Sequence, residues 1–241
     1  SNPSAPHALL KSVLVAMNIV YLTSDLSLQH QLDELGGGLE ILVTSTLPRG
    51  SGLGTSSIIA AAAVYSLARA LGRVYSKKSV IHLTLIVEQL LSTGGGYQDQ
   101  VGAVFGGFKS CSSAKKLPLD VDSAMLIAPQ KFVELFDSHI LLIYTGIPRL
   151  ARNLLDSVIF KWYHHAQEFR LIFDELCSTA HKMEKAISEG NLVEVGRCLN
   201  AYWTQKRKLA TGAEPAMVTK LMNHLRPLTI GMALAGAGGG E

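Results

Sequence analysis

Residues 50–57 read G-S-G-L-G-T-S-S, a run of alternating glycines followed by three hydroxyl side chains. Glycines leave backbone N–H groups free to converge on an anion. The hydroxyls stand where a helix would begin, beside its unpaired N–H groups and the positive end of its dipole. A phosphate group fits such a site. The alternative is an ordinary glycine-rich turn with a Ser or Thr N-cap.

Two better-known phosphate loops do not describe this run. No lysine follows the last glycine, as a Walker A loop requires, and the spacing departs from G-x-G-x-x-G. The sequence therefore predicts an anion-binding helix start of another kind.

Two carboxylates follow the loop in the sequence. Glu88 is the only acidic residue of a predicted helix over residues 76–92, and Asp99 comes eleven residues later, after three glycines. On pattern alone Glu88 belongs to a solvated stripe with Thr84 and Ser92, which lie four residues to either side. Asp99 could instead cap a short helix that begins at Gln100.

Two cations lie in an unfavourable position. Arg149 and Arg152 fall in the first turn of a predicted helix, where the dipole disfavours positive charge. A phosphate or carboxylate partner would account for them, and simple exposure to solvent is the alternative.

The elements that would position these residues alternate between helix and strand. Hydrophobic periodicity and turn residues predict a mixed α and β chain without internal repeats or a clear linker. We expect helices over residues 7–22, 60–70, 76–92, 160–188, 192–208 and 215–225, and strands over 39–46, 117–128, 139–145 and 229–235.

Composition excludes several other classes of protein. The 241 residues are 48% apolar and 17% charged, with a net charge of +3 and no basic block, so nucleic-acid binding is not expected. The apolar run over residues 9–22 carries Lys11 and is too short to span a bilayer. The three cysteines are far apart, which fits free thiols in a reducing compartment, and we expect a cytoplasmic protein without membrane partners.

The loop string is similar to the second signature of the GHMP small-molecule kinases, in which a proline precedes G-L-G-S-S-A. Here residues 48–57 read P-R-G-S-G-L-G-T-S-S, and residues 235–240, A-G-A-G-G-G, resemble the third glycine motif. The resemblance implies an α+β GHMP kinase fold, with an incomplete N-terminal part like ribosomal protein S5 and a ferredoxin-like C-terminal part. It also implies ATP and Mg²⁺ as cofactors.

The resemblance also implies roles for particular residues. Ser56 and Glu88 would hold Mg²⁺, while Asp99 would act as the base, assisted by Arg149. Thr55 and Ser57 would contact phosphate. The ATP-binding set would be Pro48, Gly50, Ser51, Gly52, Leu53, Gly54, Thr55, Ser56, Ser57, Gly236, Gly238 and Gly239.

Within the superfamily, four strings most resemble the L-fucose kinase family, which phosphorylates the anomeric hydroxyl of L-fucose. They are T-G-G-G-Y-Q-D-Q-V-G, H-I-L-L-I-Y-T-G-I-P-R-L-A-R-N-L-L, Y-W-T-Q-K-R-K and L-A-G-A-G-G-G. Heptose-7-phosphate kinases share the Asp and Arg strings more loosely and are the alternative enzyme.

The same resemblance predicts how the chain is organised. Residues 1–110 would form the ATP-binding part and 111–241 the C-terminal part, within a longer chain that carries a nucleotidyltransferase-like N-terminal region. No opening R-x-D-x-x-G-G motif precedes residue 39, and the sequence stops inside the third glycine motif. We therefore expect an incomplete kinase domain, and a non-catalytic fragment or pseudo-kinase is the competing interpretation.

Overall fold

The structure of the chain, a computed structural model, describes residues 2, 5–47, 51–91, 95–145, 151–164, 166–210 and 212–236. Side chains are described for these residues except 151–157 and 166. The chain divides into two units. The first takes in Ser1–Pro48, Gly54–Gly106 and Cys111–Ser123, and the second takes in Arg49–Leu53, Gly107–Ser110 and Ala124–Glu241.

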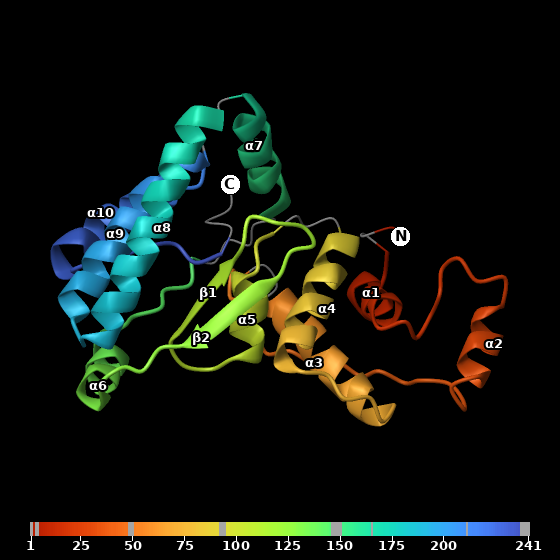
Figure 1. The fold of residues 1–241 in the computed structure, drawn as a ribbon. Helices are drawn as coiled ribbons and strands as arrows, with labels where there is room; N and C mark the ends of the chain where they lie inside the picture. The colour runs from red at the N-terminus through yellow and green to blue at the C-terminus, as the bar shows by residue number, and fades with distance from the viewer. Residues whose placement is uncertain are drawn as a thin grey trace. The chain divides into compact units, whose positions relative to one another are not determined.

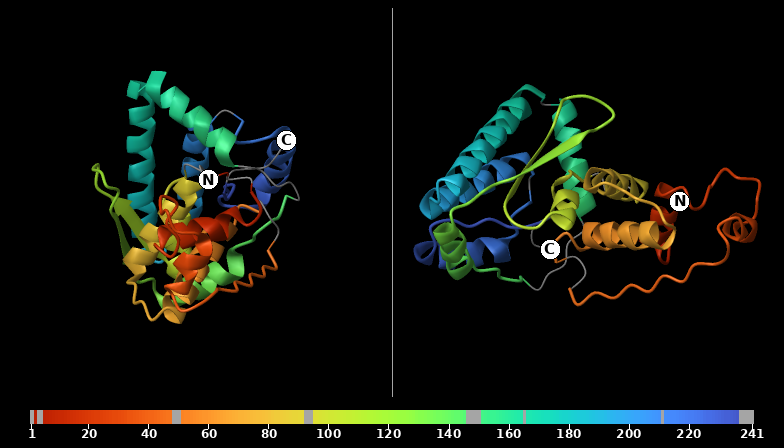
Figure 2. Two further views of the ribbon diagram at one scale, coloured as in Figure 1. Left: turned by 90° about the vertical axis from the view of Figure 1, so that its right-hand side faces the viewer. Right: turned by 60° about the horizontal axis from the view of Figure 1, so that its bottom comes forward.

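The first unit is built on helices packed through small and β-branched side chains (Figure 1). Its helices are α1 (Ala8–Ala16), α2 (Leu28–Asp33), α3 (Thr55–Ala70), α4 (Lys77–Leu90) and α5 (Gln98–Val104). α3 lies beside α4, as the right-hand view of Figure 2 shows, and it also contacts α1 and α5. Alanines on α3 let the helices approach closely, and Ala60, Val64 and Val80 are among the fully buried side chains of this core.

Turn residues fix the ends of α3 and α4. Gly72 follows α3 with φ +64°, the left-handed conformation that a residue after a helix often adopts. Ser76 is the N-cap of α4, and its hydroxyl accepts a hydrogen bond of 3.1 Å from the Ser79 N–H. These residues fix where α3 ends and α4 begins, and the two helices then pack so that Ser57 contacts Glu88.

In the described residues, β1 (Lys109–Ser113) pairs with β2 (Val121–Met125) in a two-stranded sheet. Val121 and Leu119 pack with Ile81 and Leu85 of α4, all within the first unit. This small cluster supports the face of α4 that leads to Glu88.

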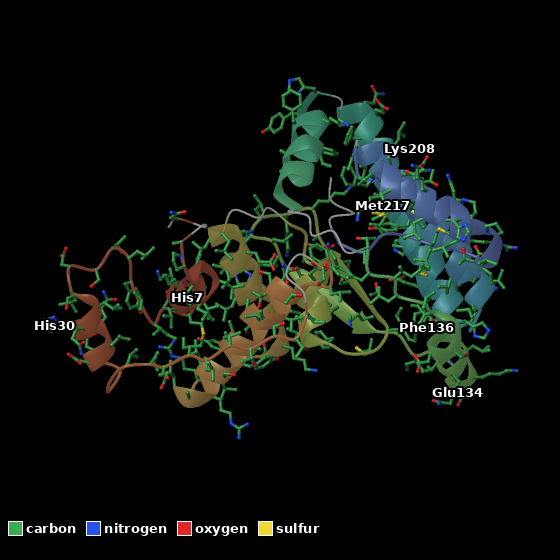
Figure 3. All side chains as sticks on the ribbon, turned by 180° about the vertical axis from the view of Figure 1, so that it is seen from behind. His7, His30, Glu134, Phe136, Lys208 and Met217 are labelled. Atoms are coloured by element: carbon green, nitrogen blue, oxygen red, sulfur yellow. The ribbon has the colours of Figure 1, made fainter. Side chains whose placement is uncertain are left out.

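The second unit contains the remaining helices of the described residues. They are α6 (Gln130–His139), α7 (Ala151–His164), α8 (Ala166–Ser188), α9 (Leu192–Leu209), α10 (Ala216–Leu225) and the 3₁₀ helix η1 (Arg226–Leu228). α8 and α9 lie side by side, and Asn191 caps α9 by accepting from the Glu194 N–H at 3.0 Å. On α6, half-buried Phe136 packs edge-on against Phe108 at 5.0 Å between ring centroids, while Glu134 is exposed (Figure 3).

Several predicted elements differ in the structure. The first predicted helix ends at Ala16, the long one over 160–188 is divided between α7 and α8, and α2, α6 and β1 were not predicted. Within the described residues, 39–46, 140–145 and 229–235 form no sheet, and the predicted strand over 117–128 is reduced to β2. Apolar, β-branched sequence favours extended backbone, but a strand also needs a partner that supplies ladder hydrogen bonds. The predicted division at residues 110 and 111 stays a prediction.

No helix in the described part of the chain is both long and apolar enough to cross a membrane. All three cysteines are free, as the sequence predicts.

Candidate active site

The start of α3 has the character of an anion-binding helix terminus. Gly54 is its N-cap, with φ +68°, and no side chain caps the helix. The alternative of an ordinary Ser or Thr N-cap is therefore wrong, because the capping position carries no side chain. The first N–H groups of this 16-residue helix lack the usual side-chain acceptor, which an incoming anion would supply.

Hydroxyl groups around this helix start differ in their surroundings. Thr55 Oγ1, in the first unit, is buried without a hydrogen-bond partner, and so is Ser51 Oγ in the second. A buried hydroxyl without a partner is costly, so each of these atoms, within its own unit, is suited to receive a polar ligand. Ser56, the predicted Mg²⁺ contact, is exposed to solvent.

Ser57 makes the contact that joins α3 to α4. Its side chain is 2% exposed, and its hydroxyl donates a short hydrogen bond to Glu88 Oε1. A phosphate oxygen can only accept from a hydroxyl, and the single Ser57 proton is already given to Glu88. The structure thus turns Ser57 toward the carboxylate rather than toward a phosphate.

Glu88 lies half-buried in the last turn of α4. Burial raises the pKa of its carboxyl above the ordinary value, and the charge of Asp99 acts in the same direction, while the hydrogen bond from Ser57 opposes the shift. A carboxylate near a helix C-terminus is also disfavoured by the dipole. The solvated-stripe interpretation is therefore wrong, and Thr84, one turn earlier, is fully buried.

Asp99 lies in the first turn of α5, whose N-cap is Tyr97, so the interpretation of Asp99 as a helix cap is wrong. It adjoins the start of α3, since a Cβ placed on Gly54 would lie 3.5 Å from Asp99 Cγ. The residue is exposed, although the flanking glycines and glutamines favour a partly buried carboxylate.

Gln100 follows Asp99 and is fully buried. Its amide acts on the Glu88 carboxyl in the direction that lowers the pKa, yet neither its nitrogen nor its oxygen makes a hydrogen bond of good geometry. The structure thus associates Gln100 with Glu88 rather than with its neighbour in the sequence, Asp99.

This arrangement fits a magnesium ion held jointly with a nucleotide. Within the described residues, no three His, Cys, Asp or Glu side chains gather as a metal cage. Mg²⁺ is commonly held by one or two carboxylates together with substrate phosphates, and it keeps several waters. Glu88, with Asp99 close enough to act on its pKa, supplies that donor set beside the start of α3. A cation would relieve the repulsion between the two acids.

A second glycine contact lies entirely within the second unit. Gly52 has φ +75°, and a Cβ on it would lie 2.9 Å from the Ala235 carbonyl oxygen. A Cβ on Gly236 would lie 2.4 Å from Gly52 Cα. Lys206 on α9 donates to the Gly236 carbonyl at 2.8 Å. Two predicted ATP-binding segments are thus in backbone contact, and a lysine holds one of them.

The same unit has a cavity of about 190 Å³ beside this contact. Half-buried Leu53 lines it together with Ser51 and Gly52, and most of the other lining side chains are apolar. The remaining predicted site residues, Pro48, Gly50, Arg149, Gly238 and Gly239, lie outside the described residues, as does the side chain of Arg152.

Sequence reasoning missed two residues of this region. The sequence indicates Lys206 only as part of the string Y-W-T-Q-K-R-K, and Gln100 only as the possible start of a short helix. Helical spacing alone does not mark either one. Gln100 precedes Val101, which is also buried, and a polar residue next to an apolar one is only a weak sequence signal of burial. The signal for Lys206 is its place one helical turn after Tyr202, because its ammonium lies over the Tyr202 ring at 5.6 Å from the ring centroid.

Comparison with known proteins shows which families this chain resembles. Residues 18–107 match the family described as GHMP kinases N terminal domain, a range that includes the start of α3, Glu88 and Asp99. The chain is 35% identical over 219 residues to an L-fucokinase/L-fucose-1-P guanylyltransferase of Bacteroides fragilis, covering 89% of this chain and 23% of that protein. It is 32% identical over 235 residues to a bifunctional fucokinase/GDP-fucose pyrophosphorylase of Arabidopsis thaliana, covering 98% and 21%.

More distant similarity extends to mevalonate kinases. That of Pyrococcus horikoshii is 26% identical over 209 residues, covering 84% of this chain and 58% of that protein. The crystal structure of L. major mevalonate kinase in complex with R-mevalonate superposes with a TM-score of 0.59 at 17% identity, covering 100% of this chain and 70% of that one. The chain thus spans less than a quarter of the two bifunctional relatives and has an α+β GHMP kinase fold. Its residues 18–107 match the N-terminal domain of the GHMP kinases, and among these relatives the chain is most similar to the L-fucokinases.

Proposed function

We propose that this chain is the phosphoryl-transfer region of an ATP-dependent sugar kinase that converts L-fucose to L-fucose 1-phosphate. The observation that carries the proposal is that Ser57 donates a hydrogen bond to Glu88, and the charge of Asp99 acts on Glu88, beside a helix start that no side chain caps. Phosphoryl transfer depends on positioning and on charge stabilisation rather than on covalent chemistry by the protein. This region offers N–H groups, hydroxyls and two carboxylates for those tasks.

The nucleotide would be bound by the loop and the helix start. The free N–H groups of α3 and the Thr55 and Ser51 hydroxyls would take the phosphate oxygens, with Ser56 and Glu88 holding Mg²⁺. The bound Mg²⁺ would neutralise charge on the phosphates. Gly52 and Gly236 would let two backbone segments approach each other without side chains between them.

Asp99 would act on the acceptor. Its carboxylate would orient the anomeric hydroxyl and accept its proton as the sugar oxygen bonds to the γ-phosphorus and the bond to the β-phosphate oxygen breaks. The products would be the sugar 1-phosphate and ADP, with the proton on Asp99. Exposure of Asp99 to solvent is compatible with access by a small acceptor.

The choice of L-fucose depends on the two fucokinase relatives, which are longer proteins. Mevalonate kinases also match, and heptose-7-phosphate kinases remain the alternative from the sequence. By likeness to the bifunctional relatives, this region would operate in a longer chain with a nucleotidyltransferase activity. The widely spaced cysteines favour a reducing compartment such as the cytoplasm. The competing class is a pseudo-kinase that retains the fold without turnover.

The test uses the 241-residue chain and two measurements. Calorimetry with ATP and Mg²⁺ should show metal-dependent binding, and ADP release should be stimulated by L-fucose above D-galactose, D-mannose, a heptose 7-phosphate and mevalonate. If a different acceptor stimulates ADP release more than L-fucose does, that acceptor would replace L-fucose as the proposed substrate. Metal-dependent ATP binding without release of ADP on any acceptor would favour the pseudo-kinase class.

A metal-site variant sharpens the same test. Glu88→Gln retains an oxygen that can accept from Ser57 but loses the negative charge. The Mg²⁺ concentration for half-maximal ADP release should rise at least about tenfold, the effect expected when a hard cation loses a carboxylate ligand. An unchanged Mg²⁺ requirement would remove Glu88 from the metal site.

A further inference from the structure

Two buried polar side chains beside Glu88 have no part in the proposed bond-making steps. Ser57 comes from α3 and is 2% exposed, and Gln100 comes from α5 and is 0% exposed. Glu88 itself comes from α4, and α3, α4 and α5 all contact one another within the first unit. Three helices therefore each contribute one polar group to the same buried place.

The contacts of Ser57 and Gln100 differ. The Ser57 hydroxyl donates to Glu88 Oε1. The Gln100 amide acts on the Glu88 carboxyl as a hydrogen-bonding side chain, but neither its nitrogen nor its oxygen makes a hydrogen bond of good geometry. Leaving buried polar groups unpaired lowers the stability of the folded state. An apolar residue would avoid this cost at a fully buried position. The presence of an amide at residue 100 is therefore not explained by folding stability.

We infer that Ser57 and Gln100 are positioning residues that hold the Glu88 carboxylate in the orientation required by Mg²⁺. This inference rests on the proposed function, and it goes further by assigning a supporting shell to the metal ligand. Partners of this kind orient ligating carboxylates, and their loss typically weakens metal affinity about 10- to 100-fold. Neither residue needs to touch the nucleotide or the sugar.

Such support should matter more for Mg²⁺ than for Ca²⁺. Mg²⁺ requires nearly ideal octahedral geometry, whereas Ca²⁺ accepts six to eight oxygens in flexible arrangements. A carboxylate that is free to turn should therefore lose more affinity for the smaller ion. This difference separates orientation of Glu88 from general damage to the fold, which would weaken both complexes alike.

The experiment compares four variants with the parent chain. Ser57→Ala and Gln100→Leu remove the proposed supports, and Ser57→Thr retains the hydroxyl. Thr84→Val is the matched control, because Thr84 is a fully buried hydroxyl on α4 that bonds the Val80 carbonyl at 2.8 Å rather than Glu88. Calorimetric titration with ADP, which permits no turnover, is run in EDTA and at a series of free Mg²⁺ and Ca²⁺ concentrations.

We expect Ser57→Ala and Gln100→Leu each to raise the Mg²⁺ midpoint for ADP binding about tenfold or more, with a smaller change in Ca²⁺ and none in EDTA. Ser57→Thr and Thr84→Val should match the parent. Gln100→Leu should also unfold at a higher temperature than the parent, because it removes buried unpaired groups. A gain in stability together with a loss of Mg²⁺ affinity is not the behaviour of a residue that only supports the fold.

The outcomes separate this inference from the proposed function. If the parent binds ADP with Mg²⁺ dependence and both support variants keep its midpoint, the inference fails while the proposed function stands. Equal losses in Mg²⁺, Ca²⁺ and EDTA would also overturn it. A parent that shows no metal-dependent nucleotide binding would contradict the proposed function and the inference together.

Discussion

Two of the close glycine contacts in the described residues, at Gly54 and at Gly52, differ in the groups that surround them. In the first unit, Gly54 adjoins Asp99, and the neighbouring helices supply a hydroxyl and a second carboxylate. In the second unit, Gly52 and Gly236 meet backbone to backbone, and a Cβ on either one would collide with the other segment. The first contact therefore depends on polar side chains, which substitutions can change one at a time. The second depends on close backbone packing, which any added side chain would disrupt.

This difference predicts two kinds of variant. Changes at the side chains of the first unit should alter metal use or turnover while the protein stays folded. Changes at the glycines of the second unit should displace a loop and weaken nucleotide binding as a whole. The experiments below test this separation in order of decreasing expected effect.

The largest effect is expected at Asp99. Asp99→Asn keeps the shape of the side chain and removes the charge, so turnover should fall by a factor on the order of 10² to 10⁴, as when a general base is lost, while ATP still binds. Steady-state ADP release and calorimetry measure the two properties. Asp120→Asn is the control, because Asp120 is a carboxylate of the same unit paired with Lys78 at 2.7 Å. Near-parent turnover in Asp99→Asn would exclude Asp99 as the base.

The next effect is expected at the backbone contact. A Cβ at Gly52 would lie 2.9 Å from the Ala235 oxygen, and its φ of +75° disfavours any other residue. Backbone strain of this kind costs about 1 to 3 kcal/mol. Gly52→Ala should therefore weaken ADP binding by about fivefold to a hundredfold, since 1.4 kcal/mol corresponds to a factor of ten.

Gly72→Ala separates strain from collision. Gly72 has a similar φ of +64°, but a Cβ there would meet nothing within 4 Å. This variant should lose thermal stability and keep its nucleotide affinity. If Gly72→Ala weakens ADP binding as much as Gly52→Ala does, the contact between Gly52 and Gly236 has no special role.

Local signals in the sequence predicted the helices that carry the site. Ser76 and Gly72 mark the helix boundaries by capping and by left-handed backbone, which depend only on neighbouring residues. The predicted strands over 39–46, 139–145 and 229–235 failed for the opposite reason, because a ladder depends on a distant partner that a local pattern cannot supply.

The candidate site shows the same division. Loop glycines and carboxylates could be selected from residue types, and resemblance assigned their roles. The contact of Ser57 with Glu88 was not predicted, because which of three adjacent hydroxyls faces α4 depends on how α3 packs. Gln100 was missed for a similar reason, since its burial follows from the packing of α5 against α3 and α4.

A smaller effect is expected at Lys206. Its ammonium donates to the Gly236 carbonyl at 2.8 Å, on the backbone segment that contacts Gly52. Lys206→Met retains most of the side-chain length and loses the donor, so ADP affinity should fall by about threefold to tenfold, the scale of one hydrogen bond. Lys208→Met is the control, because Lys208 is exposed on the same helix (Figure 3). Equal affinities in the two variants would show that the bond to Gly236 does not support the loop.

The smallest effect concerns the stability of the metal-free protein and the charge on Glu88. Burial, with the charge of Asp99, raises the pKa of Glu88 above its ordinary value of 4.5, so the folded state binds this proton more tightly than the unfolded state does. By linkage, ionised Glu88 lowers stability at pH above the folded-state pKa, and the penalty is absent below about pH 4.5.

Glu88→Gln should remove that penalty. At pH 7 and without metal, the variant should unfold a few degrees above the parent, and the difference should shrink as the pH falls through the raised pKa of Glu88 and vanish below about 4.5. Thermal unfolding followed by circular dichroism at several pH values measures this. A difference in unfolding temperature that stays constant with pH would mean that the substitution acts through packing. The charge of Glu88 would then no longer distinguish the side-chain site of the first unit from the backbone contact of the second.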